Sequence, residues 1–150
     1  MDIQKTNFLD STSAAAESAG HIYPTMAACE AALESGYGTS GLAIADHNLF
    51  GMKQHSHPVY GTHVLPTREF ENGEWEVVNA NWVSYPSARE CFQDRMTTLL
   101  RLSSVYEHYR NAVAAKDAIT YVTEVSKTWS TDPERAKKVI DIYNAYVGGN

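Results

Sequence analysis

The chain reads Thr25-Met26-Ala27-Ala28-Cys29-Glu30-Ala31-Ala32-Leu33-Glu34-Ser35-Gly36-Tyr37-Gly38. The run before Glu34 combines strong helix formers with small apolar residues, which favours a buried helix over a surface helix. The two glycines that follow favour a turn at its end. We therefore expect Glu34 at the carboxyl end of a buried helix, where the helix dipole and burial both disfavour the ionised carboxylate. Such a position suits a general acid.

Helical patterns flank this stretch on both sides. Apolar spacing, N-cap residues, prolines and glycines predict helices at about 10–18, 24–36, 104–114, 117–127 and 132–146. A further helix is expected after Pro86, with Ser87 and Glu90 spaced for a capping box. Its core-facing residues are predicted to be Cys91, Met96, Leu99 and Leu100.

One segment between the helices has a different character. From Val64 to Tyr85 the chain is rich in β-branched and aromatic residues, and Asn72-Gly73 is a strong signal for a two-residue hairpin turn. We expect strands at about Val64–Phe70 and Glu74–Val83. The predicted fold class is α+β, mainly α, with one hairpin inserted after the helix that carries Glu34.

Length and composition narrow the possible classes of protein. The 150 residues fit a single domain, 1–150, and the net charge of −6 lacks the basic character typical of nucleic-acid partners. Cys29 and Cys91 are predicted to be free thiols in the core. No segment resembles a signal peptide or a membrane span, so we expect no membrane insertion. We also expect the protein to be a monomer.

A second unusual segment runs from Asp46 to Lys53. Its pattern predicts a turn that buries Leu49 and Phe50, with Gly51 allowing a tight bend. The Asn48 side chain has two possible roles, which are binding a ligand and holding this turn.

Four segments stand in an order that is typical of one enzyme family. They are Ala32-Leu33-Glu34-Ser35-Gly36-Tyr37-Gly38-Thr39-Ser40, Asn48-Leu49-Phe50-Gly51-Met52-Lys53, Glu69-Phe70-Glu71-Asn72-Gly73 and Thr131-Asp132-Pro133. Together they resemble the family 73 glycoside hydrolases, which are endo-β-N-acetylglucosaminidases of the flagellar-rod and autolysin type. The resemblance extends over about 22–146.

The resemblance implies a fold, a reaction and an acid. The fold is a lysozyme-like helical domain with a small β-hairpin lobe, at about 62–85, that forms one side of a substrate cleft. The reaction is cleavage of the β-1,4 bond after N-acetylglucosamine in peptidoglycan glycan strands, without a cofactor. Glu34 matches the general acid of the family.

A glycosidase needs a second group on the other face of the sugar, which is a carboxylate or the acetamido oxygen of the substrate. The family's second acid lies in a Thr-x-Glu-aromatic context, which is most similar to Thr67-Arg68-Glu69-Phe70. Glu69 is therefore the predicted partner. Strand alternation puts Glu71 on the same face, so Glu71 is the reserve candidate.

Aromatic side chains are good platforms for sugar rings. The candidates for substrate binding are Tyr37, Asn48, Phe50, Glu71, Trp129 and Tyr143, with Trp75 and Trp82 as further aromatic candidates.

The chain departs from the family pattern at two positions. Glu30 stands where relatives usually have glutamine, and we expect it to have a structural or tuning role. Arg135 stands where relatives commonly have a tyrosine after Thr-Asp-Pro. Trp129 or Tyr143 can supply an aromatic ring in its place.

His55-Ser56-His57 and His63 do not have the spacing of a metal site, and we expect a loop at the edge of the cleft and no bound metal. Two other functions remain open. One is a muramidase or lytic transglycosylase that acts on the same polymer, and the other is a non-catalytic wall-binding module. The expected place of action is the bacterial cell wall, with a phage endolysin released through a pore as one possible context.

Overall fold

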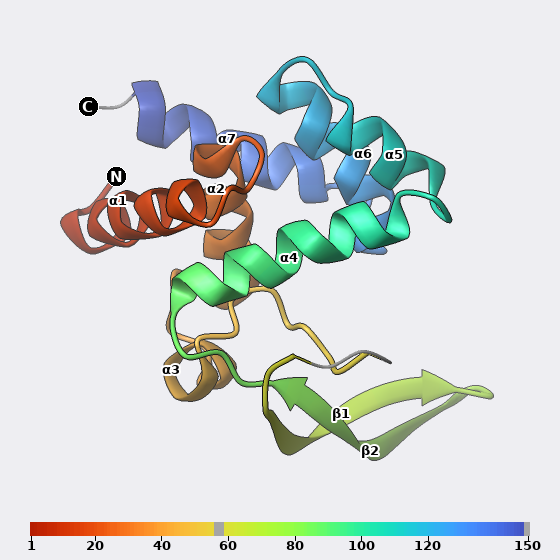
Figure 1. Ribbon diagram of the computed structural model, residues 1–150. Coiled ribbons are helices and arrows are strands. Elements are labelled where there is room, and N and C mark those ends of the chain that lie inside the picture. Colours follow the sequence, from red (N-terminus) through yellow and green to blue (C-terminus); the bar gives the residue numbers. More distant parts are fainter. Residues whose placement is uncertain (56–58, 149–150) are drawn as a thin grey trace.

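The computed structural model of the protein describes residues 1–55 and 59–148. In chain order its elements are α1 (Ile3–Ser18), α2 (Pro24–Ser35), α3 (Gly41–Asp46), β1 (Thr62–Glu71), β2 (Glu74–Val83), α4 (Ala88–Leu102), α5 (Glu107–Val113), α6 (Ala118–Trp129) and α7 (Arg135–Gly148). The predicted mainly helical fold with one hairpin is confirmed (Figure 1).

Helix α2 lies at the centre of the helical part, packed against α1 on one side and α7 on the other. Its small residues Ala27, Ala28, Ala31 and Ala32 are fully buried, as their composition predicted. Helix α4 packs against α1 and α5, and α6 packs against α5 and α7. The helix that carries Glu34 is therefore buried over most of its length.

Several helix boundaries and contacts differ from the sequence prediction. Helix α1 begins at Ile3 rather than near Asp10, because the Asp2 side chain caps it by accepting the Lys5 amide at 2.8 Å. Helix α3 was not predicted. Leu100 was expected in the core but is 55 % exposed. Ser87 is the N-cap of α4, but its hydroxyl contacts the Glu90 carboxylate instead of a backbone amide.

The end of α2 is a run of left-handed backbone. Gly36, Tyr37 and Gly38 have φ values of 58°, 56° and 81°. The Gly36 amide donates to the Ala32 carbonyl, which ends the helix as an αL cap. This turn sets the direction in which the chain leaves Glu34.

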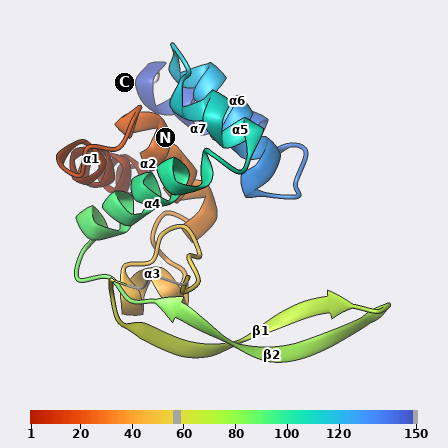
Figure 2. The same cartoon turned by 45° about the vertical axis from the view of Figure 1, so that its right-hand side comes forward.

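The hairpin projects away from the helices (Figure 2). Its strands pair antiparallel with Glu71 opposite Glu74, so Asn72-Gly73 forms the predicted two-residue turn, with φ values of 53° and 80°. At the other end the Val83 amide donates to the Met52 carbonyl at 3.0 Å. The hairpin is thus fastened at its base to the loop that follows α3.

Both cysteines are buried and unbonded, as predicted. Among residues 1–55 and 59–148, no helix is long and apolar enough to cross a membrane.

Candidate active site

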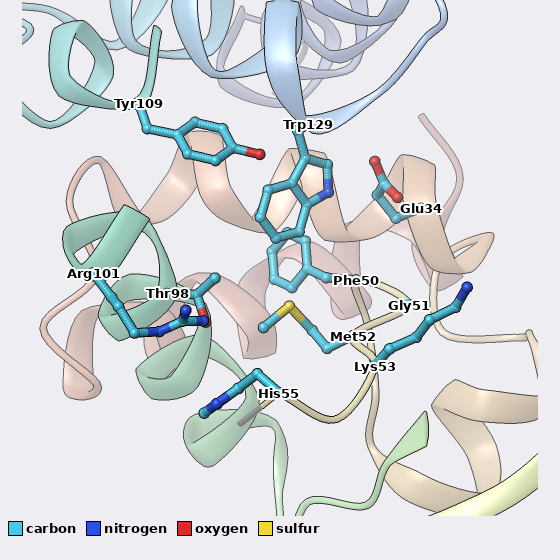
Figure 3. Close-up of a pocket in the computed structure, with 10 residues that line it drawn as sticks. All are labelled: Glu34, Phe50, Gly51, Met52, Lys53, His55, Thr98, Arg101, Tyr109 and Trp129. Carbon is cyan, nitrogen blue, oxygen red and sulfur yellow. The ribbon is translucent and has the colours of Figure 1, made fainter. Parts of the chain in front are cut away.

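A pocket of about 360 Å³ lies between the helices and the loop after α3 (Figure 3). Glu34 and Lys53 stand towards one end and Arg101 and Tyr109 towards the other, with Trp129 between them. The residues that line it are Glu34, Phe50, Gly51, Met52, Lys53, His55, Thr98, Arg101, Tyr109 and Trp129. Three of the predicted site residues, Glu34, Phe50 and Trp129, therefore meet in one pocket.

Glu34 stands at the wall of this pocket, at the last turn of α2. Its side chain is only 23 % exposed, although the helix end around it is open to solvent. One of its oxygens, Oε1, accepts a hydrogen bond from Nε of Arg135 at 2.9 Å. The local sequence around Glu34 gave no sign of this cation, which contacts the carboxylate directly.

Behind Glu34 lies a network of buried charges. The Glu30 carboxylate, fully buried, is bound by Arg95 Nη2 at 2.7 Å and by Arg135 Nη2 at 2.9 Å. Tyr121 donates its hydroxyl to the same carboxylate. Arg135 also donates through Nη1 to the Ser126 hydroxyl at 2.8 Å. Each buried charge in this network has a charged or polar partner, which is the condition for keeping charges inside a protein.

The electrostatics of this network keep its carboxylate ionised. Burial by itself would raise the pKa of Glu30, but Arg95, Arg135 and the Tyr121 hydroxyl lower it to about 2. His21, next to Arg95, has its pKa lowered to about 4 by burial and by the guanidinium, so it is neutral at pH 7. The structural role expected for Glu30 fits this placement.

Arg95 also supports the aromatic wall of the pocket. Its guanidinium lies over the Phe50 ring at 4.5 Å and over the Trp129 ring at 4.2 Å. The two rings are edge-to-face, with centroids 6.1 Å apart. The network that binds Glu30 therefore also fixes the rings next to Glu34.

Asn48 holds the turn. It is 1 % exposed, it donates to the carbonyls of Met52 and Val83, both at 2.9 Å, and its oxygen accepts the Met52 amide at 2.9 Å. These contacts occupy the amide group, so the second of its two possible roles fits the structure.

Tyr37 and Tyr143 lie outside the pocket. Tyr37 packs edge-to-face on Phe8 with centroids 5.9 Å apart, and Lys5 lies over its ring at 5.1 Å. Tyr143 is half-buried against the helical core. The structure thus brings neither ring to Glu34.

The hairpin contacts residues that line the pocket, and one of these contacts is an ion pair. Lys53, which lines the pocket, contacts Glu69 Oε1 with its Nζ at 3.2 Å. Glu71 is exposed at the hairpin tip, opposite Glu74. Of the two candidate partners of Glu34, Glu69 is the one connected to the pocket.

Of the histidines considered as metal ligands, His55 lines the pocket and His63 contacts Asp46 Oδ2 through Nδ1 at 2.9 Å. Ser56 and His57 lie outside the described residues. Within those residues, no group of three or more His, Cys, Asp or Glu side chains is placed to hold a metal ion.

Sequence reasoning missed the roles of four residues on helices distant in sequence from Glu34, which are Arg95, Thr98, Arg101 and Tyr109. Lys53 stands in a segment that was singled out, but its contact with Glu69 was not predicted. Arg135 could have been found from the sequence, because it stands where members of the family commonly have a tyrosine.

Comparison with known proteins identifies the family of this chain. The family model described as mannosyl-glycoprotein endo-β-N-acetylglucosaminidase, or glucosaminidase, matches residues 11–147. The chain belongs to the glucosaminidase family. The resemblance to family 73 is thereby confirmed.

Individual members of the family are similar over most of this chain. The exo-glucosaminidase LytG of Bacillus subtilis is 31% identical over 131 residues, covering 84% of this chain and 45% of LytG. A probable N-acetylmuramidase of Lactococcus lactis subsp. cremoris is 28% identical over 151 residues, covering 93% of this chain and 33% of that protein. The chain spans less than half the length of the curated relatives it matches.

The fold is also that of solved family members. The catalytic domain of the autolysin Auto from Listeria monocytogenes superposes with a TM-score of 0.84 at 26% identity, covering 98% of this chain and 86% of that one. The lysozyme-like helical fold with a hairpin is confirmed by this match.

Proposed function

We propose that the protein is a peptidoglycan hydrolase that cleaves the β-1,4 bond after N-acetylglucosamine, with Glu34 as the general acid. The observation that carries this proposal is the place of Glu34, on the wall of a pocket with aromatic sides, in a chain of the glucosaminidase family. The substrate is the glycan strand of the bacterial cell wall, and the protein acts there as a monomer.

In this mechanism Glu34 donates a proton to the glycosidic oxygen as the bond to the anomeric carbon breaks. Trp129 offers its ring to the sugar, since C–H groups of pyranose rings pack well on aromatic side chains. The positive charge that develops on the sugar requires a stabilising group on its other face.

Glu69 is the residue proposed for that face, acting as base for a water molecule or stabilising an acetamido-assisted route. Its support is the ion pair with Lys53, which anchors the hairpin carboxylate to the rim of the pocket. Glu71 remains the reserve candidate.

The test of the proposal is Glu34→Gln, assayed by lysis of purified cell walls and by release of reducing ends. The amide retains shape and polarity but has no proton to donate, so we expect a loss of at least about 100-fold in rate. Glu17→Gln removes a carboxylate from an exposed position of α1 and serves as the matched control. Undiminished lysis by folded Glu34→Gln would refute the role of Glu34.

A second candidate function is cleavage of the other glycosidic bond of the same polymer. The name of the Lactococcus lactis relative, a probable N-acetylmuramidase, supports this alternative. Mass spectrometry of the released fragments separates the two. Reducing-end N-acetylglucosamine supports our proposal, whereas reducing-end or anhydro-muramic acid supports the alternative. A wild-type protein that binds walls without releasing fragments would be a wall-binding module.

A further inference from the structure

The two oxygens of the Glu34 carboxylate have different surroundings. Oε1 is hydrogen-bonded to Nε of Arg135 at 2.9 Å. Within the described residues, Oε2 has no hydrogen-bond partner, and the side chain lines the pocket. A carboxyl group with one oxygen engaged in this way presents the other to a substrate.

Arg135 itself is held in one orientation. The residue is 1 % exposed, and its three donor groups each have a separate acceptor, which are Glu34 for Nε, Ser126 for Nη1 and Glu30 for Nη2. A planar guanidinium bound on three sides cannot turn without breaking a buried hydrogen bond. The Nε–H group is therefore fixed relative to α2.

Glu30 supplies a negative charge in direct contact with the buried Arg135. Arg95 and Arg135 are two buried cations, and Glu30 and Glu34 are the two carboxylates that bind them. The two departures from the family pattern, Glu30 and Arg135, contact each other at 2.9 Å. One departure supplies the counter-charge that the other needs, so they form a single feature.

We propose that Arg135 is a positioning residue that turns Glu34 so that Oε2 carries the catalytic proton, and that stabilises the carboxylate as the proton leaves. Glu30 is the counter-charge that holds Arg135 in place. This inference rests on the proposed function and deepens it.

The chemical step is a proton transfer from Glu34 that accompanies cleavage of the glycosidic bond. The O–H bond at Oε2 breaks and its proton passes to the glycosidic oxygen. The bond between that oxygen and the anomeric carbon breaks, with its electron pair going to the oxygen, and the oxocarbenium-like carbon that is left forms a new bond to water or to the acetamido oxygen of the substrate. Glu34 is left as a carboxylate, and the Arg135 guanidinium is already in place beside the negative charge that develops. Pre-placed donors of this kind lower a barrier because they need no reorganisation during the reaction.

Other charged or titratable groups line the same pocket or belong to the buried network behind Glu34. They are Glu30 on α2, Arg95 and Arg101 on α4, Tyr109 on α5, Arg135 on α7, and Lys53 and His55 on the loop after α3. Of these, only Arg135 makes a hydrogen bond with Glu34 in the described residues. Replacing Arg135 therefore removes the cation in direct contact and leaves the others in place.

Arg135→Met and Arg135→Lys form the test pair, because methionine removes the charge and lysine retains it. Activity is measured as kcat and KM on soluble peptidoglycan oligosaccharides over a range of pH. For Arg135→Met we expect kcat to fall about 100-fold at the wild-type pH optimum, with KM unchanged. For Arg135→Lys we expect a smaller fall in kcat, because lysine retains the positive charge.

Rescue by the conservative variant gives a readout that a purely structural role would not produce. At equal folded fraction, measured by circular dichroism, we expect Arg135→Lys to retain a larger share of the wild-type kcat than Arg135→Met, because it keeps a positive charge beside Glu34.

Arg135→Met leaves Glu30 with one cation fewer, so folding must be tested separately. Glu30 keeps its ion pair with Arg95 at 2.7 Å in Arg135→Met, so the remaining buried charges stay partnered. We expect Arg135→Met to unfold cooperatively when thermal unfolding is followed by circular dichroism, and its kcat per folded molecule is compared with that of Arg135→Lys.

Three results would overturn the inference. These are wild-type kcat in Arg135→Met, faster turnover in Arg135→Met at all pH values, which would make the contact inhibitory, and a loss confined to KM. Failure of the proposed function itself is distinguishable, because the wild-type protein would then release no fragments that end in reducing N-acetylglucosamine.

Discussion

Ser35 and Gly38 determine how the chain turns after Glu34. The Ser35 hydroxyl donates to the Ala31 carbonyl at 2.6 Å and accepts the Gly38 amide at 2.9 Å. Gly38 has a φ of 81°, and a Cβ added there would lie 2.9 Å from a ring carbon of Phe8. At this scale the Glu-Ser-Gly-Tyr-Gly motif is a backbone turn around one carboxyl group, and its aromatic residue packs away from the pocket.

Gly38→Ala tests this interpretation. The added methyl group meets both an unfavourable φ and the Phe8 ring, so we expect the free energy of unfolding to fall by about 1–3 kcal/mol. Gly61→Ala is the control, because its Cβ would meet no atom within 4 Å. Thermal unfolding followed by circular dichroism measures both, and equal melting temperatures for the two variants would contradict the prediction.

At the scale of elements, the hairpin combines a well-determined register with an unfavourable set of charges. Its register places Glu69 opposite Glu76 and Glu71 opposite Glu74. Like charges directly opposite each other destabilise a strand pair. Among the ion pairs of the described residues, only Lys53 contacts one of these four carboxylates, and the carboxylate that it contacts is Glu69. The tip is therefore less stable than its turn chemistry alone would make it.

Glu74→Lys should stabilise the tip. It replaces a repulsive cross-strand pair by an attractive one, worth about 0.2–1 kcal/mol. Amide hydrogen exchange at the hairpin tip should slow in this variant, while exchange in α2 should not change. Glu74→Gln, which only removes the repulsion, should give a smaller effect in the same direction, and faster exchange in either variant would contradict the argument.

At the scale of the whole molecule, the buried charges join four helices. Glu30 on α2 contacts Arg95 on α4, Tyr121 on α6 and Arg135 on α7. The same arginines contact Glu34 and the rings of Phe50 and Trp129. The network thus links the packing of the helices directly to the geometry of the pocket.

Glu30→Gln should be strongly destabilising and should change the response to acid. It leaves two buried guanidinium groups without their shared carboxylate, which costs about 3 kcal/mol. The folded-state pKa of Glu30 is lowered to about 2, so its ionic contribution is complete above the unfolded value of about 4.3 and is lost as pH falls towards 2.

Denaturant unfolding at several pH values measures both effects. Between about pH 4.3 and 2 the wild type should lose stability more steeply than Glu30→Gln. Asp94→Asn is the control, since Asp94 is a buried carboxyl group that hydrogen-bonds to Tyr85 outside this network. Parallel acid limbs for the wild type and Glu30→Gln would contradict the prediction.

Much of the fold could be predicted because its signals are local. Pro24, the run of alanines and Gly36 set the limits of α2, and Asn72-Gly73 sets the turn of the hairpin. Capping and turn formation depend on residues a few positions apart, so they can be read from the chain. The beginning of α1 was missed even so, because the cap at Asp2 is not followed by a strong apolar period.

The sequence by itself determined the place of Glu34 at the end of its helix and the turn that follows, because these depend on contacts within a few residues. Only the tertiary structure decided what Glu34 touches. Arg135 is 101 positions away from Glu34, and Arg95 is 65 positions away from Glu30. Ion pairs between residues so distant in the chain depend on how whole helices pack, and the packing places a buried cation next to the acid that the local sequence had identified.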